Sequence, residues 1–256
     1  MQDPRFNQDP YRCRVEWGRR AAHDAAVRGD IVVIVDVLRF SSAVVTAVHH
    51  GAEAYAMGTK HEAIELASQT GAVVLPRDAS DPHMTTLSPR TYLGVGRGER
   101  VVIASINGGR CAQLAAEAPF VFAGAMLNAG AIADAVALIL NARPDLCLTI
   151  VPCGERWHEP HEEGHLRFAV EDYLAAGAIL VELPHEKSPE AAVCAAAFLR
   201  SEGDTFSTLR ECASGRELRS AGLDADVRDC AQLNLYDTAP VLRKRRFARW
   251  DRSMLD

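Results

Sequence analysis

Short apolar runs alternate along this chain with longer segments in which apolar residues recur at helical spacing. Residues 31–37, IVVIVDV, form a nearly continuous β-branched run, which is typical of a strand buried on both faces of a parallel sheet. Comparable runs predict further strands over 53–58, 72–77, 101–107, 120–126, 147–154 and 227–233.

The segments between these runs carry helical signals. Ser41 or Ser42 is a candidate N-cap for a helix that closes at Gly51. Helices are predicted over 41–51, 61–71, 108–118, 127–144, 166–183 and 188–203, and a helix and turn begin at residue 209. Strands that alternate with helices indicate an α/β fold with a largely parallel sheet.

Composition narrows the class of protein. The 256 residues are 48% hydrophobic, which is enough for a large core and excludes disorder as the main state. A net charge of −6 argues against a protein built to neutralise nucleic-acid phosphates. Seven dispersed cysteines without a C-x-x-C pair favour a reducing compartment. We expect a cytoplasmic protein with neither a signal peptide nor a membrane span.

Polar residues follow several of the predicted strands. In open α/β sheets the ligand crevice lies at the carboxyl ends of the strands, where these residues fall. The candidates for chemistry at these turns are Asp36, Arg39, Ser41, Asn107, Arg110, Asn128 and Cys153.

Asp36 and Arg39 follow the first strong strand. A carboxylate at this position either caps a backbone turn or holds a hard cation such as Mg²⁺. The guanidinium of Arg39 suits a phosphate or sulfonate, or it forms an ordinary surface ion pair.

Residues 107–110, Asn-Gly-Gly-Arg, link a strand to a helix. Glycines here allow the backbone to approach an anion, whose charge the helix N-terminus favours. The alternative is an ordinary Asn-Gly turn. The segment matches neither a Walker A loop nor G-x-G-x-x-G, so it gives no support for nucleotide binding.

Three other features have two interpretations each. Cys153 with Gly154 is either a reactive thiolate at a helix start or a buried inert thiol. The histidine-rich stretch 155–165 is either a metal tract or a solvated lid, and we favour the lid. Adjacent Glu171 and Asp172 interrupt an apolar helix, so one of them faces a site or a helix N-terminus unless both are solvated.

Several segments together resemble the 2-phosphosulfolactate phosphatases, the ComB-like proteins of coenzyme M biosynthesis. The resemblance covers about residues 30–240 in one order. The matching segments are IVDVLRFSSAVVTAVHHGA (34–52), LSP (87–89), SINGGR (105–110), AGAMLNAGAIADAV (123–136), VPCG (151–154), FAVEDYLAAGAI (168–179) and SGRELRSAGLDADV (214–227).

The resemblance implies a Mg²⁺-dependent phosphatase that acts on a phosphorylated, sulfonated or carboxylated hydroxy acid. It also implies a three-layer α/β/α fold, with two similar subdomains as one arrangement. Asp36, Glu171 and Asp172 are then the catalytic candidates, with Asp36 and Glu171 binding metal. The implied substrate-binding residues are Arg39, Ser41, Asn107, Gly108, Arg110, Asn128, Cys153 and Gly154.

Some loops depart from the family pattern. LPRDAS (75–80) and TLSP (86–89) stand where the family has G-E-R and G-N-S-P, INGG (106–109) replaces T-N-G-T, and PCG (152–154) replaces C-A-G. The departures indicate either a different substrate or a non-catalytic member that binds a small sulfonate or phosphate metabolite.

The domain organisation follows from the extent of the resemblance. We expect an N-terminal extension over 1–29 and one domain over 30–242, with lobes near 30–145 and 146–242. A basic C-terminal tail then covers 243–256. For that tail we favour a surface or oligomer contact over nucleic-acid binding. A homodimer is the expected assembly.

Overall fold

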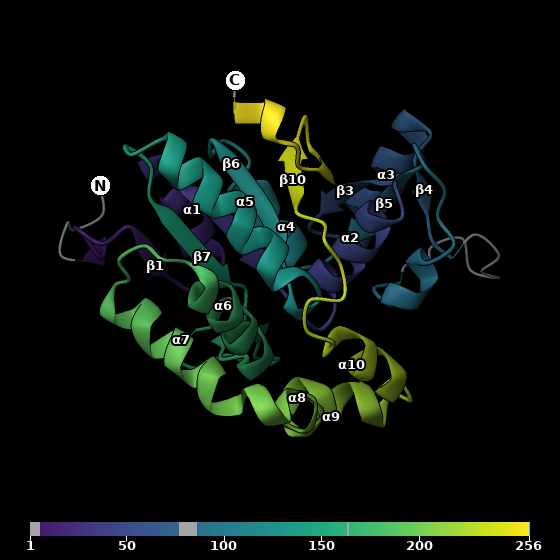
Figure 1. Cartoon of the computed structure of the whole chain (residues 1–256). Coiled ribbons are helices and arrows are strands. Elements are labelled where there is room, and N and C mark those ends of the chain that lie inside the picture. Colours follow the sequence, from purple (N-terminus) through teal and green to yellow (C-terminus); the bar gives the residue numbers. More distant parts are fainter. Residues whose placement is uncertain (1–5, 77–85, 163, 256) are drawn as a thin grey trace.

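The computed structural model describes residues 6–76, 86–162 and 164–255. One nine-stranded sheet, in the order β1-β7-β2-β6-β10-β11-β3-β5-β4, forms the centre of the molecule (Figure 1). Its strands are β1 (Cys13–Val15), β2 (Ile31–Val35), β3 (Glu53–Met57), β4 (Val73–Val74), β5 (Arg100–Ala104), β6 (Phe120–Gly124), β7 (Leu148–Pro152), β10 (Pro240–Arg243) and β11 (Arg246–Arg249). A separate ribbon pairs β8 (Glu155–Arg156) with β9 (Leu166–Arg167).

Helices cover both faces of this sheet, so the predicted three-layer α/β/α fold is confirmed. They are α1 (Gly18–Arg28), α2 (Phe40–His49), α3 (Lys60–Thr70), α4 (Gly108–Leu114), α5 (Ala129–Ala142), α6 (Val170–Glu182), α7 (Pro189–Ser201), α8 (Thr205–Glu211), α9 (Ala213–Ser220) and α10 (Asp224–Cys230). None of the helices among the described residues is long and apolar enough to cross a membrane.

Strand β2 is apolar at every position because both of its faces pack into a hydrophobic core. Val33 packs into the core formed with α5 and α6, whereas Val32 and Ile34 pack into the core formed with α1, α2 and α4. Both faces of β2 are therefore buried. The alternation of strand side chains supplies each core with a separate set of residues.

The sheet consists of two parallel parts joined by an antiparallel hairpin. Strands β1, β7, β2 and β6 form one part, and β3, β5 and β4 form the other. The hairpin β10–β11 pairs with β6 on one side and with β3 on the other. The run 243–256, set apart above as a basic tail, thus contributes β11 to the middle of the sheet, with Phe247 fully buried.

Residues 13–28 also belong to the α/β fold. Strand β1 pairs with β7, and α1 packs against α4. These elements come from 1–29, the range predicted to precede the domain. Strand β7, from the predicted second lobe, pairs with β2 of the first, so both ranges share one sheet.

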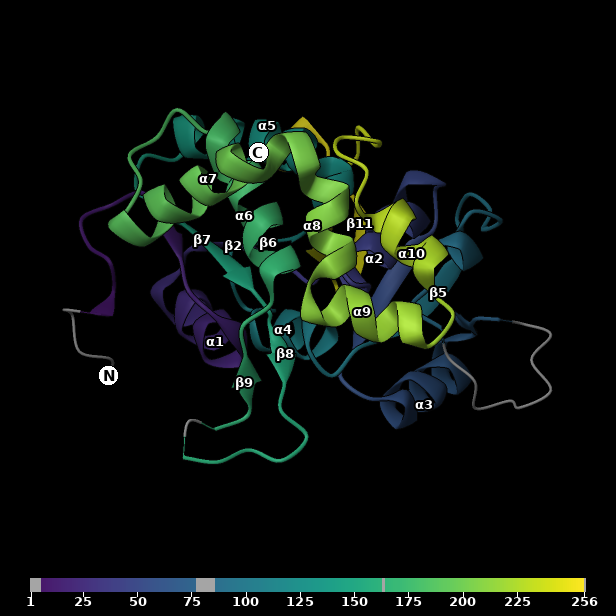
Figure 2. The same ribbon diagram turned by 90° about the horizontal axis from the view of Figure 1, so that it is seen from below.

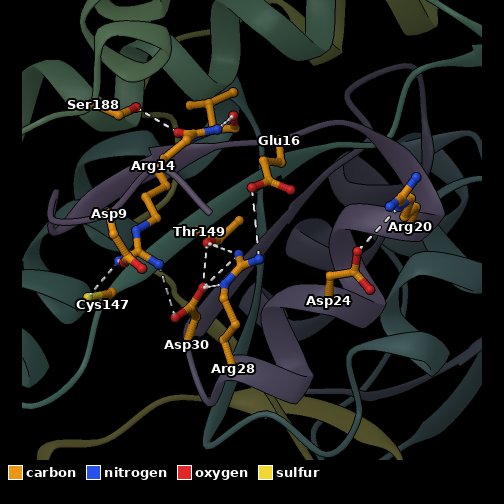
Figure 3. Close-up of polar contacts among 12 residues, drawn as sticks. Asp9, Arg14, Glu16, Arg20, Asp24, Arg28, Asp30, Cys147, Thr149 and Ser188 are labelled. Carbon is orange, nitrogen blue, oxygen red and sulfur yellow. Dashed lines mark hydrogen bonds and ion pairs between the residues drawn. The ribbon is translucent and has the colours of Figure 1, made fainter. Parts of the chain in front are cut away.

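A polar network joins the amino ends of β1, β2 and β7 (Figure 3). Buried Asp30 accepts hydrogen bonds from Arg28 Nε at 3.0 Å and from Thr149 Oγ1 at 2.7 Å. Arg14, also buried, lies 3.9 Å from Asp30 and pairs with Asp9. Because each buried charge has a partner here, the network holds α1 and β1 on the sheet.

One predicted strand is wrong. Residues 227–233 do not form a strand, because 224–230 are helix α10. Val227 and Cys230, three positions apart, are both fully buried and mark one helix face. Asp224 and Asp226 lie in the first turn, where negative side chains stabilise a helix through its dipole.

Candidate active site

A cavity of about 280 Å³ lies where four strands of the two parallel parts end. It contains side chains that follow β2, β3, β5 and β7. The lining residues are Asp36, Leu38, Arg39, Gly58, Thr59, Lys60, Leu87, Ala104, Ser105, Ile106, Asn107 and Glu155.

The curvature of the sheet creates this cavity. Strands β2 and β5 are five positions apart in the sheet, which corresponds to about 24 Å in a flat sheet. Asp36 Oδ2, just after β2, nevertheless accepts a hydrogen bond from Ser105 Oγ, just after β5, at 3.0 Å. Twist and the packing of both parts around α2 bring these strand ends together.

Asp36 is fixed by backbone amides from two helices. Its Oδ2 accepts a hydrogen bond from Gly108 N at 2.8 Å, and its Oδ1 accepts one from Phe40 N at 3.3 Å. The Asp36 amide in turn donates to Ser41 Oγ at 3.0 Å. Asp36 therefore caps the starts of α2 and α4 while its carboxylate lines the cavity.

The two glycines of the 107–110 segment permit this packing. A Cβ on Gly108 would lie 2.3 Å from the Phe40 ring and 2.7 Å from Asp36 Oδ2. A Cβ on Gly109 would lie 2.0 Å from the Met57 carbonyl oxygen. The glycine pair allows a close anion approach, as the sequence predicts. The anion that the Gly108 amide binds here is the Asp36 carboxylate.

Two cationic side chains line the cavity. Arg39 forms a close ion pair with Asp226 of α10, whose other oxygen accepts a hydrogen bond from Ser88 Oγ at 2.6 Å. The LSP motif and the 214–227 motif thus meet at Arg39 and fix its guanidinium. Lys60, at the start of α3, is the second cation.

Glu155 provides the second carboxylate of the cavity. Its Oε2 accepts a hydrogen bond from Asn107 Nδ2 at 2.9 Å. Burial, together with the negative charges of Asp36 and Glu171, raises the pKa of Glu155 to about 8. Burial also raises the pKa of Asp36. The cavity therefore places two carboxyl groups where their ionised forms repel each other.

Glu171 and Asp172 lie behind the cavity in the first turn of α6. Asp172 accepts hydrogen bonds from Val37 N at 2.8 Å and from Gly154 N at 3.0 Å, which ties the ends of β2 and β7 together. Glu171 is buried, with its Oε2 3.3 Å from Cys212 Sγ. Neither carboxylate lines the cavity, although Glu171 interacts electrostatically with Glu155, and Asp172 does so with Asp36 and Glu155.

Three other predicted residues lie inside the protein rather than along the cavity. Ser41 donates to the Ile34 carbonyl oxygen at 3.1 Å. Asn128 donates from its amide to the carbonyl oxygens of Ala123 and Thr238. Cys153 is buried, and its pKa is raised well above the ordinary value, mainly by burial. This thiol stays protonated at neutral pH, which favours the inert interpretation.

Sequence reasoning missed three of the cavity residues: Lys60, Ser105 and Glu155. Ser105 and Glu155 both follow buried strands, the same signal that identified Asp36. Glu155 begins the histidine-rich stretch in the sequence, and in the structure it is the first residue of the β8–β9 ribbon. Figure 2 shows this ribbon projecting from the body of the molecule. Within the described part of that stretch, no cluster of metal-ligating side chains forms.

The structure describes only some of the segments that depart from the family pattern. Residues 77–80 of LPRDAS lie outside the described residues, as do residues 81–85 and residue 163. Leu87 of TLSP and Ile106 of INGG line the cavity, and Ile106 is 55% exposed. The altered segments TLSP and INGG therefore contribute to the lining of the cavity.

The fold and this cavity define an α/β protein whose polar site lies at the carboxyl ends of its strands. Residues 19–245 match the family model described as 2-phosphosulpholactate phosphatase. The chain belongs to this family.

Curated relatives align with this chain over most of their length. Proteins named "Probable 2-phosphosulfolactate phosphatase" are 31% identical in Thermus thermophilus and 30% identical in Carboxydothermus hydrogenoformans. The aligned parts cover 84% and 82% of this chain, and 89% and 84% of those proteins, respectively. A relative with the same name in Gloeobacter violaceus is 28% identical.

Proposed function

We propose that this protein is a Mg²⁺-dependent phosphatase that hydrolyses the phosphate ester of 2-phosphosulfolactate or a similar hydroxy acid. The observation that carries the proposal is the cavity, in which Asp36 and Glu155 are combined with the cations Arg39 and Lys60. The family and the printed names of the relatives support the same reaction.

The residues present fit a magnesium ion. Mg²⁺ is usually bound by one or two carboxylates, several waters and the substrate phosphate. Asp36 and Glu155 would hold the ion, and its charge would offset the burial and the repulsion by Asp36 and Glu171 that raise the pKa of Glu155. Glu171, predicted as a ligand from the sequence, acts in this proposal through its charge from behind the cavity. Bound Mg²⁺ supplies electrostatic stabilisation of charge on the phosphoryl group.

The chain's own side chains then perform the positioning. Arg39, held by Asp226, presents N–H donors to the phosphoryl oxygens, and Lys60 adds a second positive charge. Asn107 orients Glu155 through its amide. Positioning and electrostatic stabilisation carry most of phosphoryl-transfer catalysis, so these fixed contacts are the relevant ones.

Phosphate release tests this proposal. Purified protein is incubated with 2-phosphosulfolactate and 2-phospholactate, with Mg²⁺ or with EDTA. We expect turnover only with Mg²⁺, and a loss of about 100-fold or more in Asp36→Asn and in Glu155→Gln. Asp134→Asn, which removes an exposed carboxylate on α5, is the matched control and keeps full activity.

Two results would contradict the proposal. Wild-type protein that releases no phosphate from either ester with Mg²⁺ is not this phosphatase. If these esters nevertheless raise its melting temperature, the protein is a metabolite-binding member of the family. The expected dimer, the cytoplasmic location and the absence of nucleic-acid binding stay predictions.

A further inference from the structure

Three arginines from separate elements meet beside the cavity. Arg19 of α1 donates a close hydrogen bond from its guanidinium to the carbonyl oxygen of Ile106, a cavity residue. Arg156 directly follows Glu155, another cavity residue. The Arg110 side chain lies over Gly58, since a Cβ built there would be 3.2 Å from Arg110 Cδ. All three therefore lie next to residues that line the cavity.

The packing of α1 against α4 brings Arg19 and Arg110 near each other. Burial and the positive charges of Arg156 and Arg110 lower the pKa of the Arg19 guanidinium. Like charges are held close at this point, although separation would be electrostatically favoured. A bound anion would remove this repulsion.

These arginines differ from Arg39 in their partners. Within the described ranges, none of the three forms an ion pair with a carboxylate, and Arg110 instead donates to Gln113 Oε1 at 3.1 Å. The Glu62 carboxylate accepts hydrogen bonds from Gln113 Nε2 and from the amides of Gly58 and Thr59, and these bonds, together with the charge of Arg110, lower its pKa. In this arginine cluster, Arg19 and Arg156 therefore form no ion pair with a described carboxylate, and Glu62 offsets part of the charge of Arg110.

We propose that Arg19, Arg110 and Arg156 bind the second anionic group of the substrate, its carboxylate or sulfonate. This inference rests on the proposed phosphatase function and assigns the phosphate itself to Arg39 and Lys60. Guanidinium groups suit this task because their planar N–H donors match carboxylate and sulfonate oxygens. The cluster would then select phosphate esters that carry a second anion.

Two esters separate this role from catalysis. 2-Phosphosulfolactate carries additional anions, and isopropyl phosphate has none. We expect Arg19→Met and Arg156→Met to lower kcat/KM for 2-phosphosulfolactate by about 10- to 100-fold, since charge-assisted hydrogen bonds are lost. For isopropyl phosphate, kcat/KM stays within about twofold of wild type.

Two further variants control for loss of structure. Arg20→Met, at the next position of α1, removes an exposed guanidinium and leaves both substrates unaffected. Arg19→Lys keeps the charge and restores part of the selectivity. Equal losses for the two esters in Arg19→Met, or no loss for either, would overturn the inference.

A binding measurement keeps the test independent of turnover. Calorimetric titration uses sulfoacetate as the sulfonate probe and inorganic phosphate as the comparison. We expect Arg19→Met and Arg156→Met to lose sulfoacetate binding and to keep phosphate binding, even if no ester is hydrolysed. Wild-type protein that does not bind sulfoacetate, or variants that bind it equally well, would contradict the arginine cluster as an anion site.

Discussion

At the scale of single residues, the site depends on how closely backbone segments approach. Gly109 lies so near the Met57 carbonyl that no side chain fits between them. The sequence motif suggested glycines that approach a ligand. The structure shows glycines that allow α4 to begin against β3 and Asp36 to cap that helix.

This contact predicts a strong effect of one methyl group. Gly109→Ala should lower the free energy of unfolding by at least about 2 kcal/mol, because the backbone must move to accept the Cβ. Gly94→Ala is the control, since a Cβ at that exposed position meets open space, and it should change stability by less than about 0.5 kcal/mol. Urea denaturation measures both. Equal stability of the two variants would show that α4 does not require this close approach.

His49, which lies outside the cavity, makes the stability of the protein depend on pH. The His49 ring stacks on Tyr236 and contacts Thr238 Oγ1 at 3.0 Å. Burial and the neighbouring His50 lower the pKa of His49, although Asp237 opposes this effect. The unfolded chain therefore binds a proton on His49 at a higher pH than the folded protein. Stability contributed by neutral His49 is lost as the pH falls below the ordinary histidine pKa.

His49→Gln should make the acid loss of stability shallower. We expect the fall in melting temperature between pH 7.5 and pH 5.5 to be about 1 °C smaller than in wild type. His61→Gln, on the exposed side of α3, serves as the control and should follow the wild-type curve. A His49→Gln curve parallel to wild type would rule out this contribution.

At the scale of elements, the hairpin β10–β11 was the hardest to predict. Lys244 and Arg245 form its two-residue turn, and both have positive φ, 50° and 70°. Turns of this kind normally contain Asn-Gly, which marks a hairpin in a sequence. The pair Lys244-Arg245 carries no such signal, so the sequence predicts a basic tail here instead of a hairpin. Most of the strands and helices that were predicted from apolar periodicity are present in the structure.

The stability of the Lys244-Arg245 turn can be increased by substitution. Replacing Lys244-Arg245 with Asn-Gly should raise the free energy of unfolding by about 1 kcal/mol, because positive φ is unfavourable for Lys and Arg. Replacement with Ala-Ala should give no such gain, since alanine has the same restriction. Chemical denaturation compares the two variants. A larger gain from Ala-Ala would attribute the effect to charge removal instead of backbone conformation.

At the scale of the whole molecule, the hairpin joins the two parallel parts of the sheet. Phe247 of β11 lies in the same core as Ile103 of β5 and Ile34 of β2. Neither part can lose its structure without exposing this shared core. Independent lobes over 30–145 and 146–242 would instead contain separate cores.

Calorimetry distinguishes these arrangements. We expect a single thermal transition in which the calorimetric and van't Hoff enthalpies agree, because the shared core couples both parts. Two resolved transitions would indicate lobes that unfold separately. The measurement is made on metal-free protein, so that ligand binding does not add a transition.

The sequence by itself determined the local features of this protein. Apolar periodicity defined most strands and helices, and polar residues at strand ends identified Asp36, Arg39 and Asn107 as neighbours of one cavity. The tertiary structure decided which distant segments meet. Only the curved sheet brings Glu155 and Lys60 to one cavity, and only the packing of α1 on α4 brings Arg19 near Arg110, because those contacts join residues far apart in the chain.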